Sequence, residues 1–172
     1  SPPGLAGALF TPVQQRVLGL LFGQPDRSFQ GAEIIRLAGS GTGAVHRQLR
    51  RLEDAGLVDV RRQGNQKHYR ANRNAPVFEE LHGLVVKTVG LVEPLRDALE
   101  PLSDRIEVAL VYGSVAEGSD RAESDVDLLV ISDVLTYADV FEAVESAERI
   151  LARPVNPTVM TRQEWRTSTE KG

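Results

Sequence analysis

The sequence predicts an α+β protein of two domains, and charge is the first observation that divides the chain. Residues 1–75 contain 11 Lys and Arg against 5 Asp and Glu, whereas residues 76–172 contain 9 against 19. The basic half has the pattern of three helices followed by a hairpin, and the acidic half has strands that alternate with helices. This asymmetry predicts different partners for the two halves, and only the basic half suits a polyanion.

Composition excludes several classes of protein and of site. The chain has no Cys, which excludes disulfides and thiolate metal sites. It has no run of about 18 apolar residues and no signal-peptide pattern, so we expect no membrane span and a cytoplasmic location. The sequence does not begin with Met, and its only Met is Met160. We therefore expect a fragment or processed chain whose last domain is truncated.

The basic half opens with a helix signal at Thr11-Pro12, because Thr caps helices and Pro fits their first turn. Apolar residues at helical spacing, glycine-containing turns and a Gly64-Asn65 hairpin signal define the elements that follow. The predicted elements are a helix at 11–23, an extended piece at 28–30, helices at 32–38 and 42–55, and strands at 57–60 and 68–70.

The third of these helices has an apolar face, from Val45 to Leu52, and a basic face. A helix fits the major groove of DNA, where its exposed N-terminal residues meet base edges. Arg47 suits a bidentate contact to guanine, and Arg50 and Arg51 suit phosphates. A solvated basic face is the alternative. The candidate DNA-binding residues of helix and hairpin are Thr42, Gly43, His46, Arg47, Arg50, Arg51, Arg61, Arg62, Gln63, Asn65 and Lys67.

Residues 42–58, which read TGAVHRQLRRLEDAGLV, resemble the recognition helix and the start of the wing in ArsR-type and MarR-type regulators. The distinctive phrase is L-x-x-L-x-x-A-G-L-V, and the resemblance covers about residues 10–75. It implies a winged helix-turn-helix domain that binds double-stranded DNA and regulates transcription.

Residues 76–100 are predicted to form a linking helix. Apolar residues recur there in steps of three and four, which is the heptad spacing of a helical seam. Pro94 is expected to kink or end this helix near Glu93. Two interpretations stay open: a dimerisation helix, which would make the protein a homodimer, or a helix packed on its own domain. The seam consists of Phe78, Leu81, Val85, Thr88, Val92, Leu95 and Leu99.

The acidic half, residues 101–172, carries a motif between its first two predicted strands: Gly113-Ser114, then Ser124-Asp125-Val126-Asp127. Side chains two apart on a strand share a face, so Asp125 and Asp127 project together. Mg²⁺ takes such carboxylates together with phosphate oxygens, and a glycine lets the backbone approach a phosphate. A solvated acidic turn is the alternative. The predicted elements are strands at 105–112, 127–131 and 155–161, a helix at 137–152 and another from 163.

This motif, with apolar strands on both sides, resembles the signature of the polymerase-beta-like nucleotidyltransferases, especially the minimal ones. The resemblance implies a domain that uses Mg²⁺ and takes a nucleoside triphosphate as substrate or ligand. It implies catalytic and metal-binding roles for Asp125 and Asp127. It implies nucleotide-binding roles for Gly113, Ser114 and Ser124.

The chain departs from that family where a third carboxylate is expected, because Arg153-Pro154-Val155 is followed by Asn156. An amide is neither an anion nor a general base, and a two-metal displacement needs shared carboxylates to neutralise its ions. The sequence therefore predicts binding of a Mg²⁺-nucleotide at Asp125 and Asp127 but supplies no base for transfer at Asn156.

Three functions remain open at this point. The first is a DNA-binding transcription regulator whose second domain binds a Mg²⁺-nucleotide or a protein partner and thereby modulates DNA binding. The second is an active enzyme that transfers a nucleoside monophosphate to a protein or small-molecule acceptor, as in toxin–antitoxin pairs, with the winged helix for autoregulation. In the third, the second domain is only a scaffold for dimerisation or interaction.

Overall fold

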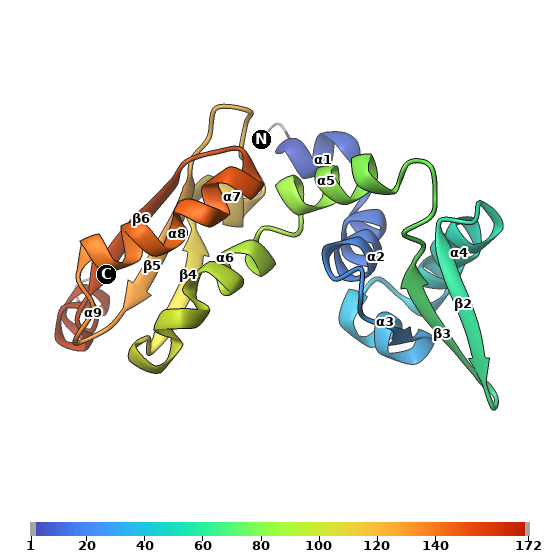
Figure 1. Ribbon diagram of the computed structural model, residues 1–172, viewed down its shortest axis with the longest axis horizontal. Coiled ribbons are helices and arrows are strands. Elements are labelled where there is room, and N and C mark those ends of the chain that lie inside the picture. Colours follow the sequence, from blue (N-terminus) through green and yellow to red (C-terminus); the bar gives the residue numbers. More distant parts are fainter. Residues whose placement is uncertain (1–2, 171–172) are drawn as a thin grey trace. The chain divides into compact units, whose positions relative to one another are not determined.

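A computed structural model describes residues 3–170, and Figure 1 follows their helices and strands. Helices and two three-stranded sheets make up the chain, which confirms the α+β class. The chain divides into two compact units. The N-terminal unit is Ala6–Glu93, and the C-terminal unit is formed by Pro94 and the residues after it together with the chain start up to Leu5. Between residues 3 and 170, no helix is long and apolar enough to cross a membrane.

The N-terminal unit packs its helices around one core and has a small antiparallel sheet in the order β1-β3-β2. Thr11 caps the first long helix in a reciprocal capping box with Gln14, as the Thr-Pro signal predicted. Phe22, Phe29 and Phe78 are the largest core side chains. The elements are α1 (Leu5–Leu9), α2 (Pro12–Gly23), β1 (Phe29–Gln30), α3 (Gly31–Ala38), α4 (Thr42–Asp54), β2 (Val58–Gln63), β3 (Gln66–Ala71) and α5 (Phe78–Thr88).

The hairpin of β2 and β3 is longer than the sequence predicted. Gly64, with a φ of +63°, and Asn65 form a two-residue turn, so the ladder continues right up to them. Arg61, Arg62 and Lys67 therefore lie within the strands, with Arg62 opposite Lys67. The predicted strands at 57–60 and 68–70 were therefore too short, because the tight turn lets the ladder include the residues on both sides of it.

The expected linking helix is two helices, α5 and α6 (Val92–Leu99), and the break lies at Gly90 rather than near Glu93. The Gly90 N–H donates to the Val85 carbonyl oxygen at 2.8 Å, which closes the end of α5. Pro94 falls in the first turn of α6, where its missing N–H would have had no partner in the helix. The predicted break near Glu93 was therefore wrong because Pro94 begins a helix instead of ending one.

The first part of the predicted seam packs on its own unit. Phe78 and Val85 are 2% and 0% exposed and belong to the core of the N-terminal unit, and Leu81 packs against that core. Their helix, α5, contacts α2. For these residues the interpretation of a helix packed on its own domain is correct, whereas Leu84 on the same helix is exposed.

The C-terminal unit is built on a sheet in the order β4-β5-β6, antiparallel between β4 and β5 and parallel between β5 and β6. Its first strand begins at Val108, later than predicted, because Pro101 opens a 3₁₀ turn. The elements after α6 are this 3₁₀ turn (Glu100–Arg105), β4 (Val108–Tyr112), α7 (Gly113–Glu117), β5 (Val126–Ile131), α8 (Tyr137–Leu151), β6 (Val155–Met160) and α9 (Arg162–Thr169).

The two faces of this sheet differ. Along β5, Val126 and Leu128 are buried on one face, while Asp127 lies on the other face and is partly exposed, although Leu129 and Ile131 farther along that face are buried. Tyr112 of β4 and Asn156 of β6 are the register partners of Asp127, so these three residues share a face. Helix α8 contacts β6 and buries its own apolar stripe. The face with Asp127 is therefore the one that can meet a ligand.

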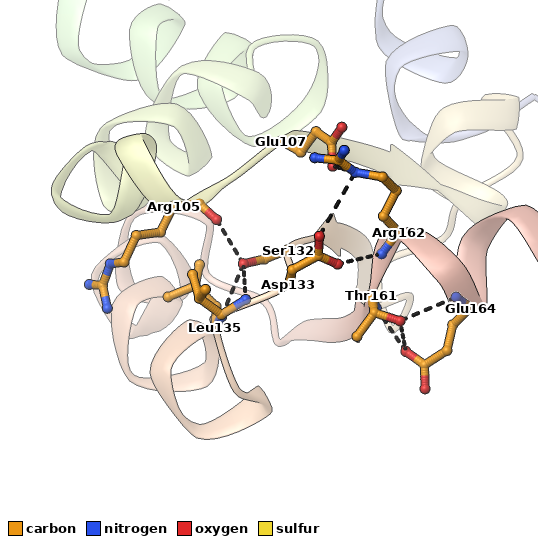
Figure 2. Close-up of polar contacts among 9 residues, drawn as sticks. Arg105, Glu107, Ser132, Asp133, Leu135, Thr161, Arg162 and Glu164 are labelled. Atoms are coloured by element: carbon orange, nitrogen blue, oxygen red, sulfur yellow. Dashed lines mark hydrogen bonds and ion pairs between the residues drawn. The ribbon is translucent and has the colours of Figure 1, made fainter.

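The opposite end of the sheet, where β5 ends, is closed by polar contacts (Figure 2). Ser132, 2% exposed, donates its hydroxyl to the Arg105 carbonyl oxygen at 2.7 Å and accepts the Leu135 N–H at 3.0 Å. One hydroxyl thus joins the approach to β4, the end of β5 and the approach to α8. At this end of the sheet, the Ser132 hydroxyl therefore has partners for both its donor and its acceptor.

Candidate functional site

The first candidate site lies at the start of β5, where the structure brings the motif residues together. Asp125 directly precedes the strand, and Asp127 is its second residue. Asn156 lies beside Asp127 in the parallel ladder, and its Nδ2 donates to Oδ2 of Asp125 at 3.0 Å. The residue that the sequence placed at the third carboxylate position thus contacts one aspartate and neighbours the other.

Gly113 fits this site for two separate reasons. Its φ is +72°, a conformation that favours glycine. A Cβ at this position would lie 3.3 Å from Cγ of Asp127 and closer still to Oδ2, so the backbone of Gly113 packs against that carboxylate. The sequence predicted Gly113 for close approach to a phosphate, and the structure adds that this glycine makes room for Asp127.

The two serines of the motif differ in what their hydroxyls do. Within the described residues, no hydrogen bond engages the Ser114 hydroxyl, whereas its carbonyl oxygen accepts the Ser119 N–H at 2.9 Å. The Ser124 hydroxyl accepts the Arg121 N–H at 2.8 Å and closes its own loop. Ser114 therefore has a donor for a ligand, while Ser124 shapes the loop that presents Asp125.

That loop is anchored by an ion pair that the sequence did not predict. Arg153 Nη1 donates to Oδ2 of Asp120 at 2.9 Å, and both side chains are only 6% exposed. Gly4 is buried against the same loop, and its N–H donates to the Gly118 carbonyl oxygen at 2.8 Å. Two contacts therefore hold the segment between Gly113 and Asp125: one from Arg153 to Asp120 and one from Gly4 to Gly118. In the sequence, only the position of Arg153, just before the third strand of this domain, pointed to a role for either residue.

A second pair that the sequence did not predict lies across the site-bearing face. The Tyr112 hydroxyl is 3.1 Å from Oγ1 of Thr158, so the ring spans from β4 to β6. Val108 and Leu110 continue the row along β4, and all three β4 side chains are between 36% and 41% exposed. The carboxylates are therefore bordered by an exposed, largely apolar shelf.

The chemistry of the site follows from this donor set. Two carboxylates and phosphate oxygens satisfy the preference of one Mg²⁺ ion, so the residues fit a single Mg²⁺-nucleotide. Among residues 3–170, no three His, Cys, Asp or Glu side chains converge as a metal cluster would require. Asn156 supplies neither a charge to share between two ions nor a base for an attacking hydroxyl. The described residues therefore do not fit a two-metal transfer site.

The second candidate site is the exposed face of α4 in the N-terminal unit. Its opposite stripe, Val45, Leu49 and Leu52, is buried in the core, as the sequence predicted. The face away from the core is free of apolar side chains at the positions predicted to meet DNA. The exposed residues there are Thr42, Gly43, His46, Arg47, Arg50 and Arg51.

The hairpin residues predicted to meet DNA do not share one face. Arg62 is the register partner of Lys67, and Arg61 is the partner of His68, so the two arginines point to opposite sides of the hairpin. Gln63 and Asn65 are exposed around the turn. Lys67 is partly buried and forms an ion pair with Glu53 of α4 at 3.3 Å. The sequence did not predict Glu53 as part of this site, because an acidic side chain repels a polyanion such as DNA.

Comparison with known families matches residues 95–164 to "Polymerase beta, Nucleotidyltransferase". The C-terminal part of the chain is therefore a nucleotidyltransferase-like domain. No curated protein matches the chain. Among solved structures, the chain is similar to TrmBL2, an archaeal chromatin protein whose structure shows a novel mode of DNA binding. The two are 15% identical over 95% of this chain and 71% of that chain, with a TM-score of 0.33.

Proposed function

We propose that this protein is a DNA-binding transcription regulator whose nucleotidyltransferase-like domain binds a Mg²⁺-nucleotide without transferring it and thereby modulates DNA binding. The observation that carries the proposal is the Asn156 amide, which bonds Asp125 beside Asp127. The two carboxylates, Asp125 and Asp127, suffice for one metal ion. Asn156 stands where a carboxylate would be needed to hold a second ion or to accept a proton.

The N-terminal unit is, in this proposal, a winged helix-turn-helix domain over about residues 10–75. Support comes from the order of three helices and a hairpin and from an α4 whose face away from the core is basic. Arg47, in the first turns of α4, is proposed to read a base, and Arg50 and Arg51 to contact phosphates. A homodimer, which would present two such helices to two half-sites, is part of the proposal.

In the C-terminal unit, Asp125 and Asp127 are proposed to hold one Mg²⁺ ion, which would neutralise the phosphates of a nucleoside triphosphate when bound. Ser114 offers its free hydroxyl to a phosphate. Gly113 has no side chain, so its backbone can approach a phosphate and the Asp127 carboxylate keeps its position. Transfer to a protein or small-molecule acceptor is not expected, because Asn156 cannot accept a proton from the acceptor hydroxyl.

We propose that the chain start couples the two units. Gly4 is buried on the loop of the nucleotide site, and the N-terminal unit begins two residues later. A Cβ on Gly4 would lie 2.6 Å from Oδ1 of Asp120 and from the Gly118 oxygen, so this contact requires a close fit. We propose that nucleotide binding stiffens the loop and, through this segment, changes the DNA affinity.

The first test is titration of the protein with Mg²⁺ and each of the four ribonucleoside triphosphates, followed by heat and by loss of triphosphate. We expect binding without loss, and we expect Asp127→Asn to abolish it. Turnover would instead show an enzyme that tolerates Asn156. Absence of binding in the wild-type protein would leave the domain as a scaffold for dimerisation or for a protein partner.

The second test is the affinity for duplex DNA with and without the bound nucleotide. We expect the affinity to change when nucleotide is added to the wild-type protein and to stay constant when it is added to Asp127→Asn. Equal changes in both proteins would mean that the nucleotide acts elsewhere, for example by competing with DNA. Arg47→Ala should reduce discrimination between DNA sequences by about 1–3 kcal/mol.

A further inference from the structure

A hollow of about 350 Å³ lies in the N-terminal unit between α4 and β3, and the roles proposed above leave two of its lining residues, Glu53 and Tyr69, unexplained. The α4 residues that line it lie on one side of the helix, at steps of three and four, and the β3 residues are two apart on the strand. Two regular elements therefore hold its walls. It is lined by His46, Arg47, Arg50, Glu53, Lys67 and Tyr69.

Three permanent cations face the hollow, and one carboxylate opposes them. Lys67 Nζ lies 3.3 Å from Oε2 of Glu53 and 3.5 Å from Oε1, and about a third of each side chain is exposed. Arg47 and Arg50 are exposed next to this pair. Burial raises the pKa of Tyr69, so its hydroxyl stays neutral and serves as a hydrogen-bonding group. This surplus of cationic donors is the chemistry that binds a phosphate.

We propose that the hollow seats one phosphate of the DNA backbone and that Glu53 weakens this contact by holding Lys67. This inference rests on the proposed DNA-binding function and deepens it. A lysine ammonium is a compact charge on a flexible stem, so Lys67 can pass from Glu53 to a phosphate without movement of the backbone.

The consequence concerns specificity. By holding Lys67, Glu53 withdraws a phosphate contact that every duplex offers, so it lowers affinity for all sequences. Base contacts such as the one proposed for Arg47 then supply a larger share of the binding free energy. Glu53 is therefore expected to keep the ratio between specific and non-specific binding high, at the expense of total affinity.

The other face of the hairpin provides an internal control. It carries Arg61, His68 and an ion pair between Arg70 and Asp59 at 3.9 Å, whose side chains are 44% and 46% exposed. Like Lys67–Glu53, this pair joins a basic residue of β3 to a carboxylate and is similarly exposed, but its carboxylate lies on β2 instead of α4. It does not line the hollow, so its carboxylate should not affect a phosphate bound there.

The experiment uses the full chain and a fluorescent DNA duplex of mixed sequence, titrated over a series of KCl concentrations. Glu53→Gln is expected to tighten binding about three- to tenfold at low salt and to steepen the salt dependence by about one released ion. Asp59→Asn is expected to leave both quantities unchanged. In a Lys67→Ala background, the gain from Glu53→Gln should largely disappear, because the cation that it frees is gone.

A second matched pair tests the two faces directly. Arg62 lies on the side of Lys67 and Arg61 on the opposite side, so Arg62→Ala should weaken binding about threefold or more and Arg61→Ala should have a smaller effect. Equal effects of these two variants, or of Glu53→Gln and Asp59→Asn, would overturn the inference while the DNA-binding function stands. A wild-type chain that binds no duplex would overturn both. Tighter binding of inorganic phosphate but not of DNA by Glu53→Gln would assign the hollow to a free anion and overturn it too.

Discussion

Two arginines bracket β6 in the C-terminal unit, and each forms an ion pair at one end of the sheet. Arg153 lies 2.9 Å from Asp120 with both side chains 6% exposed, while Arg162 lies 2.8 Å from Glu107 with side chains 53% and 42% exposed. The distances are nearly equal and the burial is not. The buried pair anchors the loop of the candidate nucleotide site, whereas the exposed pair lies among the polar contacts at the far end of the sheet (Figure 2).

The two ends of the sheet therefore take their stability from different contacts. An exposed ion pair gains little, because water screens the attraction and the side chains lose freedom. A buried pair is not necessarily stabilising as a whole, but removing one partner leaves a charge in a poorly solvated place. We therefore expect the site end to depend on an ion pair and the far end to depend on the buried hydroxyl of Ser132.

The largest effect is expected for Asp120→Ala, which should lower the free energy of unfolding of the C-terminal unit by about 3–5 kcal/mol, because it breaks the buried ion pair with Arg153. Glu107→Ala is the matched control and should cost about 0–1 kcal/mol. Trp165, the single tryptophan, lies on α9, so denaturation followed by its fluorescence reports this unit. Similar losses for both variants would show that burial does not distinguish the two ends.

Ser132→Ala should have the next largest effect, about 1–3 kcal/mol, because it leaves the Leu135 N–H and its neighbours without their acceptor. Ser146→Ala on the exposed side of α8 is the control, since that hydroxyl reaches only a carbonyl oxygen of its own helix, at 3.5 Å. The same fluorescence measurement applies. If Ser132→Ala cost no more than Ser146→Ala, the far end would not be held by buried hydrogen bonds.

Gly113→Ala should cost about 1–2 kcal/mol of stability, from forcing a residue with a Cβ into a left-handed conformation. It should also weaken Mg²⁺-nucleotide binding at least tenfold, because the new Cβ displaces the Asp127 carboxylate. Gly118→Ala is the control: its φ is +69°, and a Cβ there meets nothing within 4 Å. Calorimetric titration should separate the two, since Gly118→Ala should share the loss of stability but retain binding. Equal losses of binding would mean that backbone strain, and not the contact with Asp127, governs the site.

Asn156→Asp should place three carboxylates together and remove the hydrogen bond that the amide gives Asp125. We expect a loss of about 1 kcal/mol without divalent ions, from repulsion between like charges near the surface. Millimolar Mn²⁺ should restore this stability by binding the folded state, and should stabilise the wild-type protein less. Thermal unfolding with and without Mn²⁺ measures both. If Mn²⁺ stabilised the two proteins equally, Asn156 would not limit the metal capacity of the site.

Much of this arrangement could be predicted from local sequence pattern, because periodicity and capping describe contacts between near neighbours in the chain. The start of α2 at Thr11-Pro12 and the limits of β5 are examples. The resemblance to the nucleotidyltransferase signature implied that Asn156 stands at the third carboxylate position, and in the structure it lies beside Asp127.

What the sequence did not predict depends on contacts between distant residues. Arg153 and Asp120 are 33 positions apart, and nothing in either local pattern says that they meet or that both are buried. The contact of Gly113 with Asp127 likewise requires β4 and β5 to be placed side by side. The break at Gly90 overrode a regular apolar pattern because the residues before it pack into the core of the N-terminal unit.

The smallest effect is expected at the surface of the far end, in the capping box that starts α9 (Figure 2). The Thr161 backbone N–H and then its hydroxyl donate to the Glu164 carboxylate, at 2.7 Å and 3.0 Å, and hold the pKa of Glu164 below its ordinary value. A carboxyl whose pKa is depressed by folding contributes stability above its unfolded pKa and loses it as the pH falls through the folded pKa.

Thr161→Val removes only the hydroxyl, so the pKa of Glu164 should rise part of the way back, because the backbone donor remains. An NMR titration of the carboxyl carbons measures this, with Asp139, which Thr136 holds in the same way at the start of α8, as an unchanged internal reference. A full return of the Glu164 pKa would show that the hydroxyl, and not the backbone N–H, is the main donor.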